Sequence, residues 1–61
     1  GATESEVELG TKDGRARAWL HRNGEVLSET TLDSGNVVMT ARLPNDRLGQ
    51  FYSEFPDFNP A

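Results

Sequence analysis

The sequence predicts an α+β domain with the element order β-α-β-β-α. Apolar residues recur at every second position in residues 4–9 and 37–43, and at every third or fourth position in residues 14–23 and 45–55. A turn sequence separates the last two strands. A chain of 61 residues without cysteine can build only one core, which no disulfide can stabilise. We therefore expect nearly all large apolar side chains to lie inside a single domain.

The first element is expected to be a strand at residues 4–9. Val7 and Leu9 alternate with glutamates, so the apolar side chains would share one buried face and the acids the other. Residues 1–3 are interpreted as a linker or a cloning remnant. Because the chain begins with Gly-Ala rather than methionine, we expect it to be a piece of a larger protein.

A helix is predicted at residues 14–23. Asp13 is in position to act as its N-cap, and Gly24 suits the left-handed conformation that often follows a helix. Spacings of three and four residues place the apolar side chains on one stripe. We expect this stripe to face the core, and it consists of Ala16, Trp19 and Leu20.

Two strands joined by a tight turn are expected at residues 25–32 and 37–43. The turn sequence Asp-Ser-Gly-Asn at residues 33–36 favours a hairpin. The third strand alternates clearly between apolar and polar residues. The second alternates weakly, because Val26 and Leu27 would point to opposite faces, so the facing of that strand stays open.

A second helix should cover the sheet. Pro44 would end the third strand and Pro56 would end the helix, so the single domain is predicted to span residues 4–56, with residues 57–61 as a tail. The apolar residues of this helix recur at i, i+3, i+4 and i+7 and are Leu48, Phe51, Tyr52 and Phe55.

The connections between these elements predict the topology. A strand-helix-strand unit makes the first two strands parallel through a right-handed crossover, and the turn makes the last two antiparallel. With the third strand between the others, the sheet is a three-stranded mixed sheet of order 1-3-2 with both helices on one face. This arrangement is a ferredoxin-like split unit that lacks its last strand.

The sequence offers little for catalysis. Its six glycines form no phosphate-binding loop motif, and the single histidine, His21, is expected to be solvated. Glu25 and Glu29 would share one face of the second strand, which we interpret as solvent-exposed sheet surface and not as a catalytic pair. The longest apolar run, residues 37–39, is too short to span a bilayer. We predict a non-enzymatic, cytoplasmic chain that binds no metal, cofactor or membrane.

Positive charge is concentrated in one short stretch. The net charge is −4, yet four of the six lysines and arginines fall within residues 12–22. On a helical wheel the cations of the first helix lie opposite the apolar stripe. They form either a solvated face or a surface that contacts phosphates. The candidate partner-binding residues are Lys12, Arg15, Arg17, His21 and Arg22.

Part of the chain resembles a known family. Residues 13–29 read DGRARAWLHRNGEVLSE, and after the turn residues 37–43 read VVMTARL. This pattern resembles the C-terminal domain of HflX-type GTPases, which are ribosome-associated proteins of bacteria. The similarity extends over about residues 6–55 and includes no active-site residue of that family.

The resemblance implies a parent protein with an N-terminal nucleotide-associated domain and a central GTPase domain that binds GTP and Mg²⁺. Proteins of that family bind the large ribosomal subunit and are linked to splitting or rescuing stalled ribosomes. By this implication the chain would be a non-catalytic accessory domain that helps to dock the GTPase on ribosomal RNA or protein.

Self-association is the alternative function. The first strand could offer its edge to a second copy and build a continuous sheet, as a small regulatory module does. The glutamates of the two copies would then lie opposite each other, like charge against like charge. We expect the isolated chain to be a monomer or a weak dimer, and a mass measurement in solution would separate the two functions.

Overall fold

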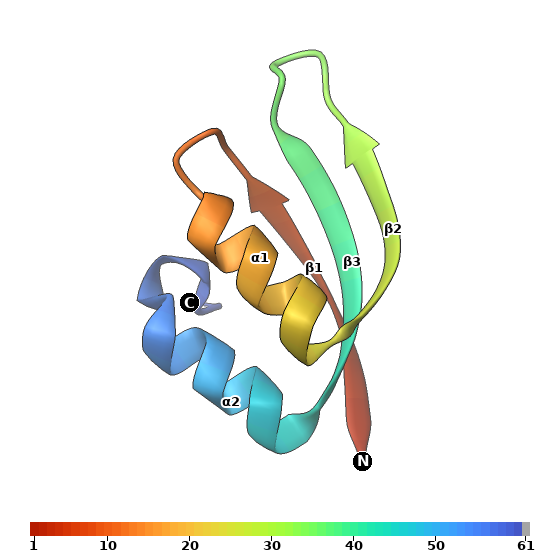
Figure 1. Cartoon of the computed structure of the whole chain (residues 1–61), viewed down its shortest axis with the longest axis vertical. Helices are drawn as coiled ribbons and strands as arrows, with labels where there is room; N and C mark the ends of the chain where they lie inside the picture. The colour runs from red at the N-terminus through yellow and green to blue at the C-terminus, as the bar shows by residue number, and fades with distance from the viewer. Residues whose placement is uncertain (61) are drawn as a thin grey trace.

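The computed structural model describes residues 1–60 as one sheet with two helices packed against the same face (Figure 1). The elements are β1 (Ala2–Leu9), α1 (Gly14–Asn23), β2 (Glu25–Thr31), β3 (Val37–Pro44), α2 (Asn45–Glu54) and a short 3-10 helix, η1 (Pro56–Phe58). The strands lie in the order β1-β3-β2. The predicted α+β class, element order, strand order and helix placement are confirmed.

Every neighbouring pair of strands is antiparallel. β1 and β2 run in the same direction, as the helical connection between them predicts, but each pairs only with β3 and is antiparallel to it. The sheet is therefore antiparallel throughout and not mixed as predicted, because the two parallel strands never become neighbours. The arrangement matches a split β-α-β unit of the ferredoxin-like type without its last strand.

β1 begins at Ala2, earlier than the sequence predicts. Its register with β3 continues without interruption over all 8 residues of the strand. Asn45 N–H donates to the carbonyl of Gly1 at 3.1 Å, and the Thr3 hydroxyl donates to Asn45 Oδ1 at 2.6 Å. The segment interpreted as a linker therefore continues the ladder with β3.

β2 contains a β-bulge at Leu27, which explains its weak alternation. Val26 and Ser28 pair with two consecutive residues of β3, so Leu27 is an extra residue in the strand. An extra residue reverses the face of all residues that follow it. Glu25 lies on the open face and Glu29 on the face that the helices cover, so the prediction that these two acids share a face is wrong.

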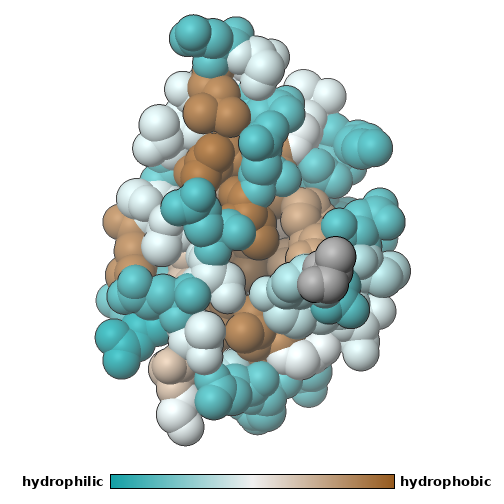
Figure 2. Space-filling view, turned by 180° about the vertical axis from the view of Figure 1, so that it is seen from behind, coloured by the Kyte–Doolittle hydropathy of each residue, from teal (hydrophilic) through white to brown (hydrophobic). Residues whose placement is uncertain are grey.

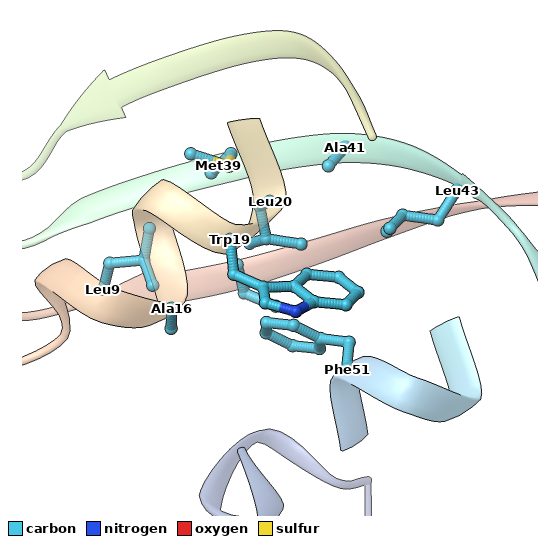
Figure 3. Packing of buried hydrophobic residues seen from close by; sticks show 9 residues of the cluster. Leu9, Ala16, Trp19, Leu20, Met39, Ala41, Leu43 and Phe51 are labelled. Atoms are coloured by element: carbon cyan, nitrogen blue, oxygen red, sulfur yellow. The ribbon is translucent and has the colours of Figure 1, made fainter. Parts of the chain in front are cut away.

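The helices and the sheet enclose one hydrophobic core (Figure 3). Trp19 is 8% exposed and Phe51 is 1% exposed, and their ring centroids lie 5.5 Å apart. The prediction that both side chains are internal is confirmed. The buried residues are Val7, Leu9, Ala16, Trp19, Leu20, Met39, Ala41, Leu43 and Phe51.

Both ends of α1 differ from the sequence prediction. Asp13 occupies the N-cap position, but its carboxylate accepts a hydrogen bond from Gly10 N–H at 2.7 Å and closes the preceding loop. Gly24 is extended, with φ at −134°, and not left-handed. A Cβ at this position would lie 3.0 Å from the Leu43 side chain and 3.1 Å from the carbonyl oxygen of Arg42. Glycine is needed here for a close approach, not for its backbone conformation.

The chain continues to pack against the domain after α2. Pro56 begins η1, where its missing N–H leaves no hydrogen bond unmade. The ring of Phe58 is half-buried, and its centroid lies 5.5 Å from that of Phe51. The first part of the segment interpreted as a tail therefore belongs to the helical layer.

Candidate interaction surface

The predicted cations lie on and before α1 and are all exposed to solvent. They do not form one uninterrupted group. Acidic side chains from β2 and α2 bind some of them, and the helix is thereby divided into a side that faces β2 and a side that faces α2. The five residues are Lys12, Arg15, Arg17, His21 and Arg22.

On the β2 side, Glu29 binds two of the cations. Arg17 Nε donates to Glu29 Oε1 at 2.9 Å, and His21 Nε2 lies 3.3 Å from the same oxygen. The hydrogen bond from Arg17 lowers the pKa of Glu29 below its usual 4.5, His21 acts in the same direction, and partial desolvation opposes both. This contact exists only because the bulge at Leu27 places Glu29 on the helix-covered face.

On the α2 side, Arg15 contacts one acid and one aromatic ring. Its Nη2 lies 3.5 Å from Glu54 Oε1, and its guanidinium carbon lies 5.3 Å from the centre of the Phe55 ring. The Arg15 side chain is 80% exposed, so solvent weakens the ion pair. The contact covers part of a half-buried ring and leaves the arginine accessible to a partner.

Lys12 and Arg22 are the two candidate cations that form no hydrogen bond or ion pair with another side chain among residues 1–60. They lie at opposite ends of α1. Arg22 belongs to the last turn, where the partial negative charge of the helix terminus favours a cation. A negatively charged partner would meet these two charges without displacing an internal ion pair.

The opposite side of the molecule is acidic along one strand. Glu4, Glu6 and Glu8 of β1 are exposed on the face that the helices leave open. Arg42 of β3 stands opposite Glu4 on one side and Glu25 on the other. Figure 2, seen from behind the view of Figure 1, shows apolar surface down the middle between hydrophilic residues. The domain therefore has a cationic helix and an acidic sheet edge on different faces.

Open depressions lie on the surface of residues 1–60. Trp19 and Gly49 of α2 are among the residues that line one of them, and another lies between the loop before α1 and the turn after β2. Within the same residues, no three His, Cys, Asp or Glu side chains come together as metal ligands. The arrangement can present charges and hydrogen-bond donors to a macromolecule.

None of the helices described between residues 1 and 60 is long and apolar enough to cross a membrane. Comparison of the chain with protein-family models, with curated proteins and with solved structures found no match. The surface of the domain and the sequence pattern that runs through its core are therefore the features that bear on its function.

Proposed function

We propose that this chain is a non-catalytic docking domain of an HflX-type, ribosome-associated GTP-binding protein. The parent protein would be bacterial and cytoplasmic and would carry the GTPase site, with its GTP and Mg²⁺, in another domain. This domain would help to hold the parent protein on the large ribosomal subunit during splitting or rescue of stalled ribosomes.

The resemblance supports this proposal because it extends through connected structural elements. Residues 13–29 form α1 and the first part of β2, and residues 37–43 form most of β3. These segments supply buried residues from two layers of the core, among them Trp19, Leu20 and Met39. A similarity of this kind follows the domain as a folded unit and is not confined to one surface segment.

The observation that carries the docking role is the exposed cationic side of α1. Ribosomal RNA presents a dense array of phosphates, and lysine and arginine contacts to phosphates position a protein without reading sequence. Lys12 and Arg22 are available for such contacts as they stand. Arg17 and His21 contribute less, because the carboxylate of Glu29 lies beside both and offsets their charge.

Two phosphate contacts give a weak attachment. On the scale measured for duplex DNA, each contact contributes about 0.9 to the slope of log affinity against log salt, so two contribute about 1.8. Such a domain acts by adding to the affinity of a second binding domain on the same chain, because the second contact is then intramolecular. The GTPase domain of the parent protein would be that partner.

Co-sedimentation of the parent protein with large ribosomal subunits, over a series of salt concentrations, tests the proposal. The double substitution Lys12→Gln and Arg22→Gln removes two charges without breaking an ion pair. We expect binding to weaken most at low salt and the salt slope to become shallower by about 1.8.

A matched pair of single variants provides the control. Arg22→Gln removes one positive charge from α1, and Arg42→Gln removes one from the open face of the sheet. Only the first should weaken binding. If the double variant binds like the wild type at every salt concentration, or if Arg42→Gln weakens binding as much as Arg22→Gln, α1 does not contact the ribosome.

A further inference from the structure

The sheet has one regular edge that remains unpaired within residues 1–60. The outer edge of β2 is interrupted by the bulge at Leu27, whereas β1 keeps one register over all 8 residues. No strand pairs with the outer side of β1 in this part of the chain. A long, regular edge of this kind is a template for another extended chain.

The backbone groups at this edge can be identified. Asn45 N–H donates to the carbonyl of Gly1, and these residues stand opposite each other if the register of β1 and β3 is continued by one position. Hydrogen-bonded and non-hydrogen-bonded pairs alternate along an antiparallel ladder. The odd-numbered residues of β1 therefore bond to β3. The residues that direct N–H and C=O groups to the free edge are Ala2, Glu4, Glu6 and Glu8.

Charge decides which chain can pair there. Residues directly opposite each other on neighbouring strands project to the same face of the sheet. An added strand would therefore place alternate side chains beside the carboxylates of Glu4, Glu6 and Glu8. Among residues 1–60 these acids form no ion pair, and only Glu8 accepts a side-chain hydrogen bond, from Asn36 Nδ2 at 2.8 Å. Lysine or arginine fits these positions.

The intervening side chains of an added strand would face the helical layer. α2 packs on β1 and β3, and Figure 1 shows α2 and η1 on the β1 side of this layer. Apolar residues at alternate positions would extend the core toward α2. Several side chains from α2, from η1 and from the residue between them are only half-buried and leave apolar surface to cover, namely Leu48, Tyr52, Phe55 and Phe58.

A second copy of the chain is a poor occupant of this edge. If two β1 strands paired antiparallel about a two-fold axis with Glu6 opposite the same residue of the second copy, Glu4 would stand opposite Glu8. Like charges that stand directly opposite each other destabilise a pair of strands. The acids therefore oppose self-association and favour a basic partner.

We propose that the outer edge of β1 binds an extended segment of a partner protein, in which basic and apolar residues alternate, as a fourth strand. The segment receives and donates backbone hydrogen bonds at Ala2, Glu4, Glu6 and Glu8. Its basic side chains lie beside the glutamates on the open face. This surface is separate from α1, so the proposal stands apart from the docking role of that helix.

Amide hydrogen exchange with a short synthetic peptide tests the proposal. The peptide alternates lysine with valine, and a control peptide has the same composition with all lysines in one block. At saturating alternating peptide, the amides of Glu4, Glu6 and Glu8 should exchange at least about tenfold more slowly. The exchange rates of the β2 amides should not change. The proposal is overturned if the control peptide protects these amides equally, if amides of β2 are protected, or if the even-numbered amides of β1 are not protected.

Two matched variants separate strand pairing from general attraction between opposite charges. Glu6→Gln and Glu25→Gln make the same change on the same open face, but on opposite edges of the sheet. The first should weaken the peptide affinity about threefold and the second should leave it unchanged. Glu6→Lys should weaken the affinity for the lysine peptide more than Glu6→Gln does, because it places one like charge opposite a lysine of the peptide.

In the absence of peptide, protection of these amides could increase with protein concentration and the chain could have the mass of a dimer. This result would assign the edge to a second copy and refute the partner proposed here. Because none of these substitutions lies on α1, loss of peptide binding leaves the ribosome prediction standing. Loss of ribosome binding in the α1 variants leaves the strand proposal standing in the same way.

Discussion

Replacement of Gly24 by alanine tests a close approach between the end of α1 and the sheet. A Cβ at this position would lie 3.0 Å from Leu43 Cγ and 3.1 Å from the carbonyl oxygen of Arg42. Leu43 is 1% exposed and the carbonyl belongs to the central strand, so neither can move freely. Overpacking of this kind costs about 1–3 kcal/mol. Alanine recovers about 0.4–1 kcal/mol by restricting the unfolded chain.

The expected net loss of stability for Gly24→Ala is thus about 1–2 kcal/mol. For a domain of this size, it corresponds to a fall in Tm of roughly 5–15 °C, measured by circular dichroism. Gly49→Ala is the matched control, because that glycine lies inside α2 and a Cβ added there would meet no atom within 4 Å. This variant should gain about 1 kcal/mol from helix propensity alone.

An unchanged or raised Tm in Gly24→Ala, alongside a raised Tm in Gly49→Ala, would refute the close approach. Chemical synthesis with d-alanine at position 24 separates the two possible reasons for a glycine there. A left-handed position accepts d-alanine readily, whereas an extended one at φ −134° is strained by it. We therefore expect the d-alanine protein to be destabilised as well.

Three other substitutions test separate parts of the structure. Phe51→Ala empties the centre of the core, where the ring is 1% exposed, and should cost about 3–5 kcal/mol, enough to unfold most of the protein as seen by circular dichroism. In Glu29→Gln, a carboxyl whose pKa is lowered in the folded state is removed. Its charge stabilises the fold above the usual pKa of 4.5, and this contribution is lost as the pH falls through the lowered pKa. From about pH 5 to pH 3 the wild type should therefore lose more thermal stability than the variant does. Leu27→Lys changes the extra residue of the bulge, which is 44% exposed, and should shift the urea denaturation free energy by no more than about 0.5 kcal/mol. A larger loss would mean that Leu27 packs in the core.

Several features of the fold could be predicted because they depend on local periodicity. The alternation of Val7 and Leu9 with glutamates identified the buried face of β1, and the spacing of Trp19 and Leu20 identified the buried side of α1. The turn sequence predicted the pairing of β2 with β3. A side chain's face depends on its position relative to near neighbours, which the sequence contains.

The candidate surface was predictable only in part. A helical wheel shows that Arg15, Arg17 and His21 are exposed, but not which acids they contact. Arg17 and His21 meet Glu29 because a bulge shifts β2 by one residue, and the weak alternation of that strand was the only sign of it. Contacts between distant segments depend on such shifts, so the division of the cations between two sides of α1 could not be read from their spacing.

The sequence by itself determined the class of the fold, the order of its elements along the chain and the inward side of each helix, because these follow from chain connectivity and from where apolar residues recur. Only the tertiary structure decided the antiparallel pairing throughout the sheet, the close approach at Gly24 and the free edge of β1. Each of these depends on which segments become neighbours in space. Because β3 runs between two strands that share one direction, it brings Leu43 against Gly24 and leaves the outer side of β1 unpaired, and no local pattern records that path.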